Sequence, residues 1–152
     1  MKKLIVICGP TASGKTALAV ECARRFQGEV VSCDAYIVYR GLNIGTAKPT
    51  EEERKGIVHH LIDVADPRDN FSVHDFEKMA VPVVEDILSR GKIPILCGGS
   101  GFYMNSVLFQ SGFGNTAADP LIRAKYEAVV QENGRETLHA LLRKCDPESA
   151  EV

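Results

Sequence analysis

Eight residues near the start of the sequence combine two turn-forming glycines with a lysine and a hydroxyl, a combination that binds phosphate groups. The segment reads GPTASGKT and fits the pattern G-x-x-x-x-G-K-[ST]. Gly9 and Gly14 let the backbone turn so tightly that successive N–H groups point at one anion. Lys15 would reach the outer phosphate, and the hydroxyl of Thr16 is the candidate ligand of a Mg²⁺ ion. The expected phosphate-binding residues are Gly9, Pro10, Thr11, Ala12, Ser13, Gly14, Lys15 and Thr16.

A strand before this loop and a helix after it would hold the loop in place. Residues 4–8 form a short apolar run typical of a buried strand, and residues 17–23 are good helix formers. The helix is expected to close near Gln27, with Gly28 as its C-cap. The positive end of its dipole would face the bound phosphates. The loop does not discriminate between a nucleotide and another diphosphate, because backbone N–H groups bind both alike.

Two further side chains follow expected strands, at the end of the sheet where α/β proteins bind their ligands. Asp34 follows a strand predicted at residues 29–33, and its carboxylate could act as a general base, assist a Mg²⁺ ion or cap a helix. Ser100 lies in the GGSG turn after a strand predicted at residues 92–97. Its hydroxyl could approach a ligand or cap the next helix. Asp63, in a strand predicted at residues 59–64, could assist a metal or be structural.

Strands and helices alternate as far as about residue 109, which predicts an α/β fold. Helices are expected to begin after Thr50, after Ser72 and at Phe102, between the strands already named. Right-handed crossovers between such elements give a parallel sheet with flanking helices, of the P-loop NTPase-like type.

From Asp119 onward the pattern is helical only. One helix is expected to about Gly134 and another at residues 135–144. The sequence therefore predicts a P-loop α/β core domain at residues 1–115, incomplete on its C-terminal side, and a helical segment at residues 116–152. Asp146, Pro147 and Glu148 look like the start of one more helix, which leads us to expect an N-terminal portion of a longer protein.

The composition is that of an ordinary globular protein. Of 152 residues, 45% are hydrophobic and 25% charged, which is enough for one core. The formal net charge of −2 gives no general reason to expect a nucleic acid partner. Five widely spaced cysteines without a C-x-x-C pair indicate a reduced, cytoplasmic chain, and no apolar segment is long enough to span a membrane. A monomer is expected.

Five ordered motifs resemble those of the tRNA dimethylallyltransferases, also called tRNA isopentenyltransferases. The resemblance covers nearly the whole sequence. The motifs are GPTASGKTALAVECA, SCD followed by VYRGLNIGTAKPT, HHLIDVADP with FSVHDF, GGSGFY, and ADPLIR with DPESA. The helical segment after residue 116 matches the start of the family's tRNA-binding insertion.

This resemblance implies transfer of a dimethylallyl group from dimethylallyl diphosphate to N6 of the adenine next to the anticodon in a tRNA. Lys15 and Mg²⁺ on Thr16 would neutralise the diphosphate, and Asp34 would accept a proton from the adenine amine. Ser100 stands where the family usually has a threonine near the reacting groups. The implied contacts with the tRNA anticodon stem-loop are Asp34, Ala35, Tyr36, Ile37, Ser100 and Arg123, and here Ala35 and Ile37 replace the usual Ser and Gln.

Two other functions fit the same residues. A P-loop small-molecule kinase would bind ATP in the loop and use Asp34 to deprotonate an acceptor hydroxyl. A non-catalytic fragment would bind a phosphate ligand and lack the rest of its site. If the chain is part of a prenyltransferase, we expect it to be inactive toward tRNA when alone.

Overall fold

The computed structural model describes residues 3–109 and 119–151. The chain divides into two compact units, Met1–Phe113 and Gly114–Val152, which are described separately below. The boundary that the sequence predicts, at residues 115 and 116, lies outside the described ranges. The division into a core domain and a helical insertion therefore stays a prediction.

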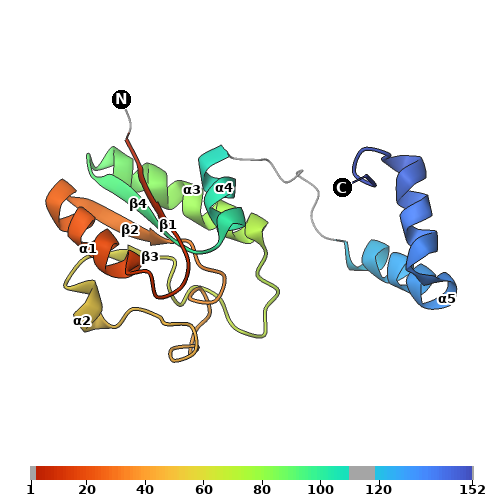
Figure 1. Ribbon diagram of the computed structural model, residues 1–152, viewed down its shortest axis with the longest axis horizontal. Coiled ribbons are helices and arrows are strands. Elements are labelled where there is room, and N and C mark those ends of the chain that lie inside the picture. Colours follow the sequence, from red (N-terminus) through yellow and green to blue (C-terminus); the bar gives the residue numbers. More distant parts are fainter. Residues whose placement is uncertain (1–2, 110–118, 152) are drawn as a thin grey trace. The chain divides into compact units, whose positions relative to one another are not determined.

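The first unit is built on a parallel sheet (Figure 1). Its four strands are β1 (Ile5–Cys8), β2 (Gly28–Ser32), β3 (His59–His60) and β4 (Ile93–Gly98), in the order β1-β4-β2-β3. Every pair of neighbouring strands is parallel. This arrangement confirms the predicted α/β fold with flanking helices.

Helices cover both faces of the sheet. The helices of this unit are α1 (Lys15–Phe26), α2 (Glu51–Arg54), α3 (Val73–Ser89) and α4 (Gly101–Phe109), and α1, α3 and α4 pack on the sheet. On one face, α1 packs Ala19 and Ala23 against apolar residues of β1, β2 and β4. On the other face, Phe76 of α3 stacks on Tyr103 of α4, with ring centroids 4.2 Å apart, over Leu96 of β4. Burial on both faces explains why the central strands are apolar runs without alternation.

Two details of the predicted elements are wrong. The left-handed cap of α1 is Gln27, with φ 53°, rather than Gly28. Gly28 instead starts β2, where a Cβ would lie 2.4 Å from the carbonyl oxygen of Ile93, so only glycine fits. The third strand is only β3, since Leu61 and Asp63 adopt left-handed φ values of 61° and 57° that a strand cannot contain.

Side chains cap three helices, two of them at the residues that the sequence predicts. Thr50 and Ser72 form capping boxes at α2 and α3. In the second unit, the carboxylate of Asp119 accepts hydrogen bonds from two backbone N–H groups at the start of α5 (Pro120–Cys145). Gly134, with φ 80°, breaks α5 into two helical pieces, at the place expected from the sequence.

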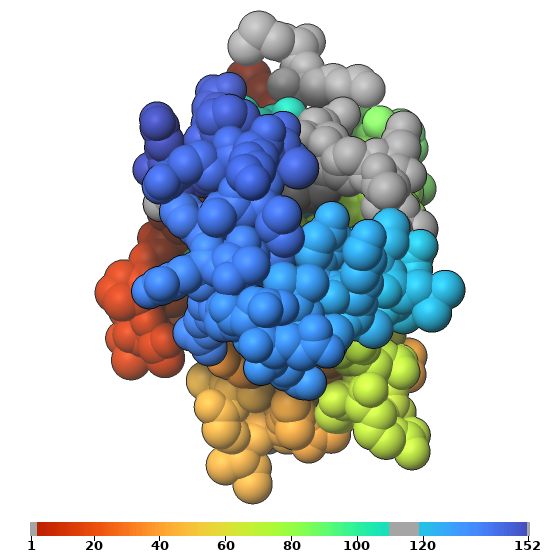
Figure 2. All heavy atoms as spheres, turned by 90° about the vertical axis from the view of Figure 1, so that its right-hand side faces the viewer, coloured from red at the N-terminus to blue at the C-terminus, as the bar shows by residue number. Residues whose placement is uncertain are grey.

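The second unit exposes most of its surface. No residue of α5 is buried, and its side chains form the blue surface that faces the viewer in Figure 2. The chain then turns at residues 147–150, where Asp146 accepts a hydrogen bond from the backbone N–H of Ser149 at 3.0 Å. Among the described residues, the helices are too short or too polar to cross a bilayer.

Candidate active site

The N-terminus of α1 lacks the kind of side-chain cap that α2, α3 and α5 have. Its N-cap is Gly14, in a left-handed conformation with φ 81°, and no side chain within residues 3–109 or 119–151 caps its first N–H groups. Helices α2, α3 and α5 are all capped by a side chain. The backbone donors at the start of α1 are therefore left for an external anion, which the helix dipole also favours.

The phosphate-binding loop closes on itself through one carbonyl. The backbone oxygen of Pro10 accepts hydrogen bonds from the ammonium of Lys15 and, at 2.8 Å, from the hydroxyl of Ser13. The ammonium of Lys15 thus lies against the loop, close to the place where the loop would bind an anion. Gly9 and Pro10 shape the loop, whereas residues 11–16 line the adjoining cavity.

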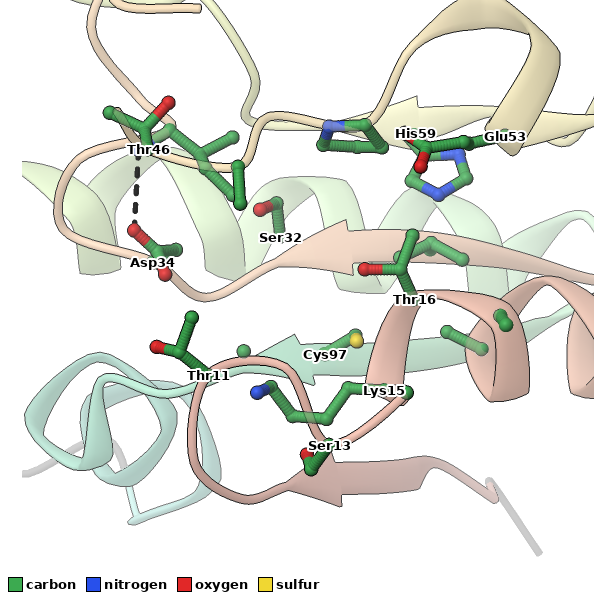
Figure 3. Close-up of a pocket in the computed structure, with 18 of the residues that line it drawn as sticks. Thr11, Ser13, Lys15, Thr16, Ser32, Asp34, Thr46, Glu53, His59 and Cys97 are labelled. Carbon is green, nitrogen blue, oxygen red and sulfur yellow. Dashed lines mark hydrogen bonds between the residues drawn. The ribbon is translucent and has the colours of Figure 1, made fainter. Parts of the chain in front are cut away.

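A cavity of about 400 Å³ extends from the loop between α1 and the segment that follows β2 (Figure 3). Asp34 and Thr11 lie on opposite sides of it. Lys15 and Thr16 also line it and lie below Ser32 in the view of Figure 3. The structure thus brings together most of the residues expected from the sequence. Three that the sequence did not indicate, Thr46, Pro49 and Glu53, form the wall across from the loop.

Asp34 caps a turn and also lines the cavity. Its Oδ1 accepts hydrogen bonds from the backbone N–H groups of Tyr36 at 2.9 Å and Ile37 at 3.3 Å, which makes it the cap of that turn. The same carboxylate borders the cavity. The two bonds fix the carboxylate in a position from which it can accept a proton from a ligand.

Ser100 contacts the chain itself. Its Oγ accepts a hydrogen bond from the backbone N–H of Ala35 at 3.0 Å, and the residue does not line the cavity. Gly98, in the turn before it, packs against the backbone of Cys33, because a Cβ there would lie 2.0 Å from that carbonyl oxygen. The close approach expected of this glycine-rich turn is therefore at least partly to the protein's own chain, and Ser100 holds the residue that follows Asp34.

The remaining residues expected to contact RNA are spread out. Ile37 lines the cavity, Ala35 is partly buried against the core, and Tyr36 is 66% exposed. Arg123 belongs to the second unit and is exposed on α5. The positions of these four residues neither support nor contradict their expected contacts with a tRNA.

His59 is a polar cavity residue that no sequence signal beyond its residue type could have indicated. Its Nδ1 lies 2.9 Å from the carbonyl oxygen of Ile57, so this nitrogen carries the proton. Burial lowers the pKa of His59, and its Nε2 is buried without a partner among the described residues. His59 therefore lines the cavity as a neutral imidazole.

Cys97 lines the cavity as a thiol. Burial raises the pKa of Cys97 to about 11. It raises the pKa of Cys33, which follows the adjacent strand β2, to about 12. Both sulfurs stay protonated at neutral pH, so neither is an activated nucleophile.

The protein oxygens at the cavity fit a Mg²⁺ ion that is held mainly by the phosphate oxygens of a bound diphosphate. No cluster of three His, Cys, Asp or Glu side chains exists within residues 3–109 and 119–151. Mg²⁺ commonly uses one or two protein oxygens together with substrate phosphates. Thr16 supplies such an oxygen beside the phosphate-binding loop. Asp63, considered as a metal helper, is instead paired with Lys48.

The comparisons with known proteins agree on one family. The family model described as IPP transferase matches residues 37–152, so the chain belongs to the IPP transferase family. Two curated relatives are tRNA dimethylallyltransferases, from Acetivibrio thermocellus at 47% identity over 99% of this chain and from Halalkalibacterium halodurans at 48% over 98%. The chain covers 48% of each of them, so it spans about half their length.

Solved structures give the same result for the fold. The full-length tRNA isopentenylpyrophosphate transferase from Bacillus halodurans is 48% identical, with a TM-score of 0.74 over 99% of this chain and 50% of that one. A eukaryotic dimethylallyltransferase acting on tRNA is 34% identical, with a TM-score of 0.79 over 99% of this chain and 37% of that one. These matches confirm the family and the α/β fold that the sequence predicts.

Proposed function

We propose that this chain carries the diphosphate-binding site of an enzyme that transfers a dimethylallyl group from dimethylallyl diphosphate to N6 of the adenine next to the anticodon in tRNA. The observation that supports this most directly is the uncapped N-terminus of α1 facing Asp34 across one cavity. An anion site opposite a carboxylate suits a reaction in which a diphosphate leaves and an amine loses a proton. Family membership supplies the substrate class.

In the proposed reaction, the allylic C–O bond breaks and its electron pair stays on the diphosphate. The lone pair of the adenine N6 forms the new C–N bond, and a proton leaves N6 for the carboxylate of Asp34. Lys15 and the N–H groups of residues 11–16 would bind the departing diphosphate. Thr16 would hold Mg²⁺, which when bound offsets part of the diphosphate charge.

The position of Ser100 gives it a supporting role in this scheme. By accepting the N–H of Ala35, it fixes the backbone beside Asp34 and hence the carboxylate. A cytoplasmic location, a monomeric state and contacts of Ala35, Tyr36, Ile37 and Arg123 with an anticodon stem-loop remain predictions from the sequence.

Ligand binding distinguishes this proposal from its alternatives. We expect dimethylallyl diphosphate with Mg²⁺ to raise the melting temperature of the chain, measured by thermal shift and confirmed by titration calorimetry. Stabilisation by ATP alone would favour the small-molecule kinase, in which Asp34 would take a proton from an acceptor hydroxyl. Equal stabilisation by dimethylallyl diphosphate, ATP and inorganic pyrophosphate would favour the non-catalytic fragment, which binds a phosphate group and lacks the rest of its site.

A further inference from the structure

Lys48 is a buried lysine outside the phosphate-binding loop. Only 5% of its side chain is exposed, and its ammonium donates hydrogen bonds to the carbonyl oxygen of Tyr39, at 2.8 Å, and to the carboxylate of Asp63. Lysine is seldom buried, because its charge loses hydration, unless the position needs that charge and its partners. The structure therefore places a polar anchor where an apolar side chain would pack at a lower cost in free energy.

The backbone around this anchor is held in unfavourable conformations. Ala47, next to Lys48, has φ 50°, and Leu61 and Asp63 have φ 61° and 57°. Non-glycine residues in this left-handed region cost free energy and persist only where surrounding contacts impose them. The contacts that hold Ala47 and Asp63 in these conformations include the Lys48–Asp63 ion pair, which joins the two strained stretches.

The partner of Lys48 is itself fixed by a second basic residue. Arg40 donates hydrogen bonds through Nε to the carbonyl oxygen of Asp63, at 3.0 Å, and through Nη2 to that of Val64, at 3.1 Å. The backbone N–H of Val64 in turn donates to the carbonyl oxygen of Val38 at 2.8 Å. Asp63 is thus a rigid attachment point on the core of the first unit.

Lys48 attaches the cavity wall across from the phosphate-binding loop to Asp63. Residues on both sides of Lys48 line the cavity, namely Thr46, Ala47 and Pro49. The far end of the wall is tied by Arg54, whose Nε donates to the carbonyl oxygen of Pro49 at 3.1 Å. Beside the polar Thr46 and Glu53, the wall has an apolar patch made by Ala47 and Pro49 with the nearby Ile37, and this patch suits hydrocarbon and not phosphate.

We propose that Lys48, through Asp63, is a positioning residue that sets the distance between this wall and the phosphate-binding loop, and so selects the hydrocarbon part of the diphosphate ligand. The inference rests on the proposed function. The loop recognises the diphosphate group alone, so discrimination among diphosphates must come from contacts beyond it. The wall carries an apolar patch, Ala47 and Pro49, that lines the same cavity as the loop.

Titration calorimetry with two ligands tests this role. The probes are dimethylallyl diphosphate and inorganic pyrophosphate, each with Mg²⁺. The variant is Lys48→Met, which keeps an unbranched side chain out to the ε position and removes the ammonium. We expect affinity for dimethylallyl diphosphate to fall about tenfold, while affinity for pyrophosphate changes by less than about threefold. The matched control is Lys78→Met, at an exposed lysine of α3, which should change neither affinity.

Asp63→Asn gives a second variant that tolerates the left-handed backbone of this position. It keeps a hydrogen-bond acceptor for Lys48 and removes the charge, so the same selective loss is expected to be smaller. Equal loss of both ligands in a folded Lys48→Met chain, or an unchanged ratio of the two affinities, would overturn the proposal. If the unmodified chain binds both ligands equally, the proposed function fails instead.

Discussion

Glu29 offers a direct test of how the first unit is held together at the end of the sheet away from the cavity. Its side chain is 4% exposed and accepts hydrogen bonds from Arg90, Lys92 at 2.7 Å and His60 at 2.8 Å. These partners join the start of β2 to β3, to the C-cap of α3 and to the residue before β4. The perturbation is Glu29→Gln, which keeps the shape and removes the charge.

The magnitude follows from the exposure of the partners. Removing one side of a fully buried ion pair costs about 3–5 kcal/mol. Arg90 and Lys92 are 37% and 44% exposed, so they recover part of their hydration when Glu29 is neutral. We therefore expect a loss of about 2–3 kcal/mol at pH 7, or about 10–15 °C in Tm for a unit of this size.

The loss should depend on pH. Hydrogen bonds from Arg90, then from Lys92 and His60, hold the pKa of Glu29 well below its ordinary value of 4.5 although burial opposes them. Because the folded pKa is the lower one, the stabilisation is present above pH 4.5 and is lost as pH falls below it. At pH 3 the difference between the two chains should have shrunk by about 2 kcal/mol.

Urea unfolding followed by circular dichroism at pH 7 and pH 3 measures both effects. Glu85→Gln, at an exposed position on α3, is the matched control and should change stability by less than about 0.5 kcal/mol. An equal loss in the control, or a loss for Glu29→Gln that is the same at both pH values, would refute the reasoning.

Three other substitutions probe the site and the fold. Lys15→Ala should weaken pyrophosphate binding by about 10–100-fold in calorimetry with an unchanged circular dichroism spectrum, because it removes a charge-assisted hydrogen bond and no core contact. Unchanged affinity would exclude the loop as the diphosphate-binding site. Asp34→Asn, in a full-length context, should lower single-turnover prenylation of an anticodon stem-loop by about 10²-fold or more with little change in diphosphate affinity, and near-normal turnover would contradict a general base. Gly28→Ala should destabilise the fold by about 2 kcal/mol or more in urea unfolding, because its Cβ would meet the Ile93 carbonyl, whereas Gly45→Ala, which meets nothing within 4 Å, should not.

Local signals in the sequence predicted the half of the site that local structure builds. The phosphate-binding loop depends on residues 9–16 and on the strand and helix that flank them, all contiguous in sequence. The caps at Thr50 and Ser72 and the break at Gly134 were equally readable, since each depends on a side chain and backbone within a few residues.

The other half of the site could not be predicted because long-range contacts build it. The wall at residues 46–49 takes its position from Lys48 and Asp63, which are 15 residues apart, with both Ala47 and Asp63 in backbone conformations that propensities disfavour. Gly28 looked like a helix cap because its role depends on Ile93, which is distant in sequence. Ser100 looked like a ligand contact because its partner, the N–H of Ala35, lies 65 residues away.

The two sides of the cavity differ in how their polar groups are satisfied, and this difference explains how one site can both bind and select. On the α1 side, no side chain of the described part of the chain caps the first N–H groups, and Lys15 donates to the loop's own carbonyl, so an anion gains several hydrogen bonds at once. On the opposite side, Lys48 has its partners within the protein and its neighbours present apolar surface. Binding free energy should therefore come mainly from the diphosphate, which many ligands share. Selectivity should come from whether the rest of the ligand fits a wall that is already fixed before the ligand arrives.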